Sequence, residues 1–535
     1  MITLFSILIC LLIFAGPFDF SQAINASESS SALSGKRTEP ISENRSQFPL
    51  MINEDNDHYF KKSSSKMNTA DLQAFIDQFA GTKVTHILFC PNGQRTSYRS
   101  SVHESIWDNI DRYKKPDIWS VNCKLLFDKG IDPYKVWIDR CRQKGISPWL
   151  SMRMNDVHYA TTPDYFRSTD HWRNHPQWWC KPYAASGGWA LFAYDYSHEE
   201  VRQYHLALVE ELLTLYDIDG FEMDWMRFCQ HLTWRHEQEK SIFLTDFVKN
   251  VRALVKKAET KWGHKITLGA RVPAAPDIAA AKGINAVEWC KAGLIDSLVV
   301  SPFFLATDHD ISINLWKEQL GEKANSVEIV PAIDNGSSPY PGAPRTGNDP
   351  ALLYGWVNEM YARGANAIYL FNWTYFDLTL PEFRTVLEEG LAPQIVLNKP
   401  RRHALAYRDV NPKGYKQIIQ LPKTTDHSNT FSIDIGKKPD AKKVSVVLAL
   451  TNRDGKRTNG TETEIKGTLP IVSLNGQKAE AANVLDSTKK YCTSASMAVV
   501  WTFDTNILKD GENLIAVEAN QTNIHKIVWA EIATE

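Results

Sequence analysis

Short apolar runs alternate with amphipathic helical patterns from Asp71 to Phe371. Each run is followed by polar loop residues, which is typical of strands buried in a parallel sheet. The pattern predicts eight strands, at Thr85–Cys90, Ser147–Met154, Ala190–Tyr194, Gly220–Asp224, Ile266–Arg271, Ser297–Pro302, Glu328–Ile333 and Ala367–Phe371. It predicts helices between them, at Pro133–Lys144, His198–Tyr216, Ser241–Lys261, Ile284–Ala292 and Leu352–Arg363.

Eight successive strand-and-helix units are the pattern of a (β/α)8 barrel, or TIM barrel. A doubly wound α/β sheet is the alternative, but no glycine-rich fingerprint follows the first predicted strand. We therefore predict an α/β fold, with a catalytic barrel over residues 69–398.

The helical period disappears after Asn398. Short β-type runs follow, separated by turn signals such as Lys509-Asp510-Gly511. This pattern predicts an all-β sandwich, jelly-roll-like, as an accessory domain over residues 399–535. The predicted strands are Tyr415–Gln420, Phe431–Ile435, Lys443–Leu450, Ala498–Phe503, Leu514–Glu518 and Ile527–Ile532.

The N-terminus has the pattern of an export signal. Ile2–Ala15 is almost entirely apolar, and Ser21-Gln22-Ala23 provides a small-x-small cleavage site, so residues 1–23 are predicted to be a cleaved signal peptide. Residues 24–68 are rich in Ser, Asn, Lys and Glu, which predicts a disordered lead or linker. We expect a secreted or periplasmic protein that does not insert into a membrane.

Composition narrows the function classes. The net charge of -2 excludes a global field that recruits nucleic acid. No CxxC pair or HExxH motif is present, so neither a metal site nor a cofactor is indicated. Seven cysteines remain after the signal segment, and we expect one or two disulfide bridges among them. The 17 Trp residues include candidates for stacking on sugars, although most belong to the core.

Two carboxylates stand two residues apart in the predicted strand Gly220–Asp224. Side chains at this spacing share one face of a strand, so Glu222 and Asp224 should both face the barrel axis. Asp224 ends the strand, at the edge where barrel enzymes carry their active sites. A carboxylate pair is what cleavage of a glycosidic bond requires, although Glu222 could instead neutralise Arg153 or Arg271.

Other polar residues follow predicted strands. The catalytic partner of Asp224 is Glu222, Asp334 or Asp156, and a turn-forming role is the alternative for Asp334. Helix capping is the alternative for Asp195, and packing is the alternative for each aromatic residue. The predicted substrate-binding residues are Arg153, Asn155, Asp156, His158, Asp195, Trp225, Arg271, Asn372 and Trp373.

The segment YDIDGFEMDWMR resembles the DGhxhD strand of glycoside-hydrolase-like barrels, in particular the glycosyl hydrolase-like 10 group. Trp289–Ser301 and Gly364–Trp373 resemble that group's sixth and eighth strand segments. The resemblance implies a glycoside hydrolase, and a similar strand of the α-amylase family implies that Asp224 is the nucleophile. Met226 stands where family 18 chitinases have their proton donor, so the chitinase mechanism is not expected.

Together these features predict a glycoside hydrolase that cleaves a poly- or oligosaccharide by a two-carboxylate mechanism. Arginine and histidine side chains would bind hydroxyls or an anionic substituent. The alternative is a non-catalytic carbohydrate-binding protein on a degenerate barrel. A polysaccharide lyase, with His158 beside Arg153, is a weaker third reading. The sequence carries no signal for an oligomeric state.

Overall fold

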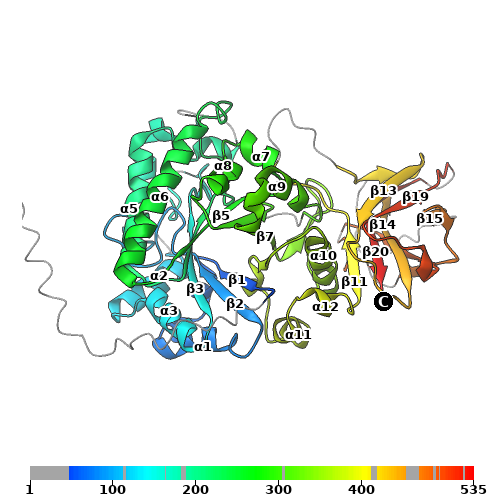
Figure 1. The fold of residues 1–535 in the computed structure, drawn as a ribbon, viewed down its shortest axis with the longest axis horizontal. Helices are drawn as coiled ribbons and strands as arrows, with labels where there is room; N and C mark the ends of the chain where they lie inside the picture. Colours follow the sequence, from blue (N-terminus) through cyan, green and yellow to red (C-terminus); the bar gives the residue numbers. More distant parts are fainter. Residues whose placement is uncertain are drawn as a thin grey trace, which may run out of the picture. The chain divides into compact units, whose positions relative to one another are not determined.

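Eight parallel strands close into a barrel, in the order β1-β10-β7-β6-β5-β4-β3-β2 (Figure 1). The computed structural model describes residues 47–112, 116–162, 164–181, 188–303, 308–410, 419–452, 469–485, 488, 490–492, 494–521 and 524–535. The barrel strands are β1 (Leu50–Glu54), β2 (Val84–Phe89), β3 (Ser147–Arg153), β4 (Gly220–Asp224), β5 (Thr267–Pro273), β6 (Ser297–Ser301), β7 (Glu328–Ile333) and β10 (Ile368–Leu370). The predicted (β/α)8 barrel is confirmed.

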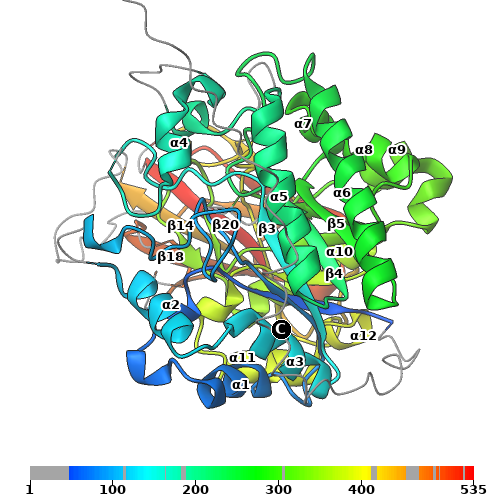
Figure 2. The same cartoon turned by 90° about the vertical axis from the view of Figure 1, so that its left-hand side faces the viewer.

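Helices surround the barrel, and α5 and α6 lie side by side on its outside (Figures 1 and 2). Their apolar faces, including Val209 and Val251, are buried, because each helix carries apolar residues at helical spacing. The helices are α1 (Thr69–Asp77), α2 (Ile118–Asp128), α3 (Pro133–Gln143), α4 (Asp170–Asn174), α5 (Glu199–Leu215), α6 (Ser241–Trp262), α7 (Pro276–Ala281), α8 (Ala286–Lys291), α9 (Ile313–Leu320), α10 (Pro350–Ala362), α11 (Pro381–Glu389) and α12 (Pro393–Val396).

A close packing contact explains the glycine at the start of β4. A Cβ atom on Gly220 would lie 2.1 Å from ring atoms of Trp149 on the neighbouring strand. That indole belongs to an apolar cluster inside the barrel, together with Leu88, Val299 and Tyr369. Gly220 is therefore explained by packing. The first carboxylate of the candidate site, Glu222, comes two residues later in the same strand.

The first barrel strand was missed by the sequence analysis. β1 lies at Leu50–Glu54, inside the region 24–68 that was predicted to be a disordered lead, so that prediction is wrong for this segment. The strand has only three apolar residues before Asn53 and Glu54, and this polar end makes it hard to recognise as a buried strand in the sequence. The predicted strand Ala190–Tyr194 is also wrong, because a 3-10 helix, η5 (Trp189–Phe192), occupies it.

Two antiparallel sheets form the C-terminal part and confirm the predicted sandwich. The first has the order β11-β20-β14-β18-β17, with β12 beside β20, and the second has the order β13-β19-β15-β16. Their strands are β11 (Arg401–Ala404), β12 (Lys423–Thr424), β13 (Asn429–Asp434), β14 (Val444–Asn452), β15 (Val472–Leu474), β16 (Gln477–Lys478), β17 (Ala481–Leu485), β18 (Met497–Phe503), β19 (Glu512–Val517) and β20 (His525–Thr534). Residues 415–418 of the predicted strand Tyr415–Gln420 lie outside the described residues.

Two further sequence predictions concern disulfide bridges and the N-terminal segment. All seven cysteines among the described residues are buried and unpaired, so the expected one or two disulfides are wrong. The predicted signal peptide, residues 1–23, lies outside the described residues. Within the part of the chain that is described, no helix has the length and apolar character needed to cross a membrane.

The place of β1 gives a testable prediction. A chain that begins at residue 69 lacks β1, which leaves the facing edges of β2 and β10 unpaired and opens the barrel. We expect that chain to aggregate or to show no cooperative thermal unfolding, as followed by circular dichroism. A chain that begins at residue 47 is the control and should unfold cooperatively. Cooperative unfolding of the barrel in the chain from residue 69 would contradict the assignment of β1.

Candidate functional site

Charged side chains gather where the barrel strands end, and we call this edge the mouth. β1, β3, β4 and β7 each end in, or lead directly into, a buried charged residue, and β5 carries buried Arg271 two residues before its end. Since the carboxyl ends of parallel barrel strands meet at one edge, these residues lie around a common opening. The charged residues of the mouth used below are Asp55, Arg153, Asp156, Asp224, Arg227, Arg271, Asp334 and Arg345.

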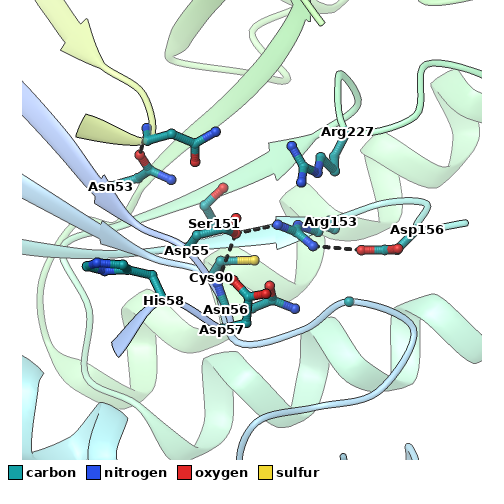
Figure 3. A network of polar contacts seen from close by, with 12 residues as sticks. Asn53, Asp55, Asn56, Asp57, His58, Cys90, Ser151, Arg153, Asp156 and Arg227 are labelled. Carbon is teal, nitrogen blue, oxygen red and sulfur yellow. Dashed lines mark hydrogen bonds and ion pairs between the residues drawn. The ribbon is translucent and has the colours of Figure 1, made fainter. Parts of the chain in front are cut away.

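Arg153 at the end of β3 lies between two carboxylates, Asp55 and Asp156 (Figure 3). One guanidinium nitrogen, Nη2, donates to Asp55, and the other, Nη1, donates to Asp156 over 2.7 Å. The backbone of Arg153 is held by Asn92, whose amide accepts from its N–H and donates to its carbonyl. The loop after β2 therefore fixes the arginine that joins β1 to the loop after β3.

The pKa values in this network follow from burial and charge. Burial acts to raise the pKa of Asp55, but the Arg153 and Arg227 guanidiniums outweigh it and hold that pKa below its ordinary value. Burial opposes ionisation of Asp156 as well, and His158 and Arg153 hold its pKa well below the usual range. Both carboxyl groups are therefore anions at neutral pH.

His158 has one defined tautomer. Its Nδ1 lies 2.7 Å from a carboxylate oxygen of Asp156, and its Nε2 lies 3.1 Å from Nη2 of Arg227. A carboxylate only accepts and a guanidinium only donates, so the proton must sit on Nδ1 and the lone pair on Nε2. Burial, with Arg227 and Arg153 nearby, lowers the pKa of His158 and agrees with a neutral ring.

Asp224 at the end of β4 forms a bidentate ion pair with Arg271 on β5 (2.9 Å to Nε and 2.9 Å to Nη2). Its Oδ1 also accepts the backbone N–H groups of Met226 and Arg227, each at 3.0 Å. The carboxylate therefore has three donors on Oδ1 and one on Oδ2. The guanidinium of Arg271 also lies 3.9 Å from the ring centre of Phe371, which follows β10.

Glu222 lies one layer deeper than Asp224 and is fully buried. Ser151 on β3 donates to its Oε1 over 2.6 Å, and its Oε2 has no hydrogen-bond partner among the described residues. Burial, together with the charge of Asp224, raises the pKa of Glu222 from near 4.5 to about 7. The alternative that Glu222 itself neutralises Arg153 or Arg271 is wrong as a direct ion pair, because aspartates occupy both guanidiniums.

Asp334 follows β7 on the other side of the mouth. Its carboxylate contacts the guanidinium of Arg345, accepts the N–H of Asn335 at 2.7 Å and accepts the side-chain amide of Asn372 at 3.3 Å. Arg345 comes from the short hairpin of β8 (Gly336–Ser337) and β9 (Thr346–Gly347), and its side chain is 35% exposed. Burial and the nearby charge of Arg227 lower the pKa of Arg345 to about 10.

Several predicted binding residues serve the architecture. The Asn155 amide bonds to the backbone of Tyr194 and Gln230. Asp195 accepts from the Ser197 N–H and from the Thr233 hydroxyl, so it holds the turn before α5. The capping alternative is wrong, because the N-cap of α5 is His198 and no side chain among the described residues caps that end. Trp225 and Trp373 are buried among other rings, so neither offers a face to a ligand.

The sequence analysis also missed residues of the mouth. Asn53, Asp55 and Asp57 come from β1 and the loop behind it, and Arg227 and Arg345 come from loops after β4 and β7. Asn53 accepts the backbone N–H of Asn372 over 2.6 Å, which ties the two neighbouring strand ends together. A signal for the β1 residues exists, because the run Asn53-Glu54-Asp55-Asn56-Asp57 directly follows an apolar stretch.

Two pockets of about 270 Å³ each lie away from this mouth, one beside Trp107 and Phe127 and one along α7 and α8. Neither includes a charged residue of the mouth. Among the described residues, no group of three or more His, Cys, Asp or Glu side chains is arranged to hold a metal ion.

No family model matches the sequence, and no curated protein matches it. Similar solved structures include a cycloisomaltooligosaccharide glucanotransferase from Paenibacillus sp. (11% identity, 90% of this chain and 57% of that chain, TM-score 0.35). Another is the PgaB glycoside hydrolase domain from Bordetella bronchiseptica (9% identity, 64% of this chain and 99% of that chain, TM-score 0.40). A third is the maltogenic α-amylase AmyB from Thermotoga neapolitana (12% identity, 88% of this chain and 99% of that chain, TM-score 0.37). The chain thus spans little more than half of the first protein, and likeness at this level describes the fold alone.

The raised pKa of Glu222 predicts a specific pH dependence of stability. A carboxyl group with a higher pKa in the folded state stabilises that state below its unfolded pKa, and this contribution is lost as pH rises through about 7. Glu222→Gln keeps a hydrogen-bonding partner for Ser151 but does not titrate. Relative to the parent, the variant should therefore gain about 3 kcal/mol of unfolding free energy between pH of about 4.5 and about 8.

Urea unfolding of both proteins at each pH measures this difference. Asp77→Asn is a control, because that carboxylate lies in an ion pair with Arg140 on the outer helices. A stability difference between parent and Glu222→Gln that does not change with pH would contradict the raised pKa.

Proposed function

We propose that this protein is a glycoside hydrolase that cleaves an O-glycosidic bond of an oligo- or polysaccharide at the barrel mouth. The observation that carries the proposal is the presence of two buried aspartates, Asp224 and Asp334, on β4 and β7 at the same end of one barrel. β5 and β6 separate these strands in the barrel order, so the two carboxylates approach the opening from different sides. Cleavage of a glycosidic bond needs two carboxyl groups that flank it.

Asp224 is suited to the role of nucleophile or base. Arg271 and two backbone N–H groups fix its orientation, so no reorganisation is needed when the reaction begins. Its Oδ2 accepts a single hydrogen bond among the described residues, which leaves a lone pair for a water molecule or for the anomeric carbon.

Asp334 is the acid that protonates the leaving oxygen in this proposal. It must first separate from Arg345, whose partly exposed side chain lies on a hairpin at the edge of the mouth. A sugar that enters would take the hydrogen bonds of Arg345 and release the carboxylate. Without its cation, the buried carboxylate would take up a proton from solvent, because burial disfavours the anion, and would then pass this proton to the leaving oxygen. Glu222 has a pKa suited to an acid, but it lies one layer deeper on β4 than Asp224, so in this proposal it acts on Asp224 through charge.

The charge balance of the mouth favours an uncharged sugar. Arg153 and Arg271, which the sequence analysis assigned to substrate binding, are already occupied by aspartates of the protein. The guanidiniums of Arg153 and Arg271 thus have aspartate partners within the protein, and an anionic substituent would have to compete with these carboxylates. The predicted signal segment and the resemblance to the glycosyl hydrolase-like 10 group complete the proposal of an extracytoplasmic glycosidase.

One observation favours a second function, a carbohydrate-binding protein without turnover. Each aspartate of the mouth is bonded to an arginine, and a carboxylate that cannot leave its partner cannot take part in proton transfer. Binding of a glycan without the appearance of new reducing ends would select this function. A product with a new carbon–carbon double bond would select the lyase.

The hydrolase is tested by incubation with a panel of neutral and sulfated polysaccharides, with new reducing ends as the readout. Asp334→Asn should lower the rate about 10²- to 10⁴-fold, the usual contribution of a general acid. The substitution is isosteric, and its arginine is exposed enough to be solvated when unpaired. Asp224→Asn is less informative, because it leaves the buried guanidinium of Arg271 without its anion and destabilises the fold.

Asp77→Asn serves as the matched control, because it also removes a carboxylate from an ion pair with an arginine, Arg140, but on the outer helices. It should keep the parent rate. Full activity of Asp334→Asn on a substrate that the parent cleaves would rule out this aspartate as the acid.

A further inference from the structure

Aromatic rings form a row along the rim of the mouth. Tyr159 follows β3, Phe228 follows β4 and Trp189 lies in η5, and His158 stands between the first two. The ring centres of Tyr159 and His158 are 6.5 Å apart, those of His158 and Phe228 are 4.6 Å apart, and those of Phe228 and Trp189 are 5.1 Å apart. We call these four residues the aromatic row. His158 also belongs to the charged network of the mouth, so the row is continuous with the proposed site.

The two ends of the row are exposed, and the middle is not. Tyr159 is 54% exposed and Trp189 is 36% exposed, whereas Phe228 is buried. Both exposed rings keep apolar surface in contact with water, which a ligand with an apolar face could cover. Each exposed ring is supported from one side, Tyr159 by Tyr165 at a centroid distance of 4.0 Å and Trp189 by Phe303 at 5.3 Å.

The backbone is strained at two positions of the row. Tyr159 has a φ of 59° and Phe228 has a φ of 61°, in the left-handed region that bulky residues avoid. Such conformations are kept where the surrounding structure imposes them, and they concentrate at functional sites. Tyr159 follows His158 in the sequence, and the ring of Phe228 lies beside that of His158 in space. The left-handed backbone at both positions thus accompanies the placement of the two rings beside His158.

We propose that Tyr159 and Trp189 are stacking platforms for two different residues of one glycan chain, so the substrate is an extended oligo- or polysaccharide and not a monosaccharide glycoside. This inference rests on the proposed function and names its substrate class. The apolar face of a pyranose stacks on an aromatic ring, and its hydroxyls reach the polar groups between the platforms. A single sugar ring is too small to cover both platforms, because His158 and Phe228 lie between them.

The groups between the platforms fit a neutral chain. His158 accepts from Arg227 between the platforms, and the guanidinium of Arg227 brings N–H donors of the kind that bind sugar hydroxyls. Asp57, another residue of the mouth, accepts from the hydroxyl of Tyr375. The Arg167 guanidinium, which donates to Asp57, also lies 5.9 Å from the ring centre of Tyr159. The rim therefore presents both hydrogen-bonding side chains and aromatic faces. A glycan chain presents the matching groups, hydroxyls and apolar ring faces.

The test measures binding separately from cleavage. Affinity gel electrophoresis of the Asp334→Asn protein uses soluble laminarin, xylan, dextran and carrageenan as probes, and retardation gives the affinity. Tyr159→Ala and Trp189→Ala, introduced into that protein, should each weaken binding of the retarding polysaccharide about tenfold. Tyr159→Phe in the same protein keeps an aromatic face at this position, so the polysaccharide should be bound with the affinity measured when Tyr159 is present. Leu215→Ala removes an exposed apolar side chain at the end of α5 and should have no effect.

The outcomes separate this inference from the proposed hydrolase. Unchanged affinity in both alanine variants, or no retardation by any of the four polysaccharides, overturns the inference. Retardation that depends on both rings, in a parent protein that releases no reducing ends, supports the inference and removes the hydrolase. Cleavage of a polysaccharide with a KM that neither alanine substitution changes leaves the hydrolase standing and overturns the platforms. Thermal unfolding of each variant at the parent temperature confirms that the fold is intact.

Discussion

The pairing of β1 with both β2 and β10 is the constraint on which the rest of the structure depends. It closes the barrel, and closure alone brings the ends of all eight strands to one edge. It also delivers Asn53 and Asp55 to the mouth, where Asn53 holds the backbone of Asn372 and Asp55 meets Arg153. A chain with an open edge at this place would lose both the closed barrel core and the contact between Asp55 and Arg153.

The charges of the mouth are held in place by one another. A buried ion pair gains little net stability, but the removal of one partner is costly because the other charge stays buried. Asp55, Arg153 and Asp156 form such a group, and Asp224 with Arg271 forms another. Their value is orientation. Carboxylates fixed by arginines need no rearrangement when a polar ligand arrives, which is the form of preorganisation that barrel enzymes use.

The sequence predicts the parts of this structure that follow a regular pattern. Seven of the eight strands, the sandwich and the inward direction of Glu222 and Asp224 follow from alternation and strand length, as β4 illustrates. β1 could not be recognised because its apolar part is only Leu50–Ile52 and its end is polar. Trp225 and Trp373 show the reverse case, since residue type suggests a sugar platform where packing buries the ring. The arginine partners of each aspartate depend on neighbouring strands, which spacing along one chain does not encode.

Depth along the strand separates the roles of the two acids on β4. A rise of about 3.3 Å per residue places Glu222 roughly 7 Å below Asp224, level with Ser151 on β3 and fully buried. There burial raises the pKa of the carboxyl group to about 7, and above it the guanidinium of Arg271 pairs with the anion of Asp224. From the inside outward, the barrel therefore has a buried acid with a raised pKa, a charged layer and an aromatic rim. A glycan offers both hydroxyls, which bind charged or polar groups, and apolar ring faces, which stack on aromatic rings. This match with the charged layer and the aromatic rim is the physical reason to interpret the mouth as a sugar-binding site.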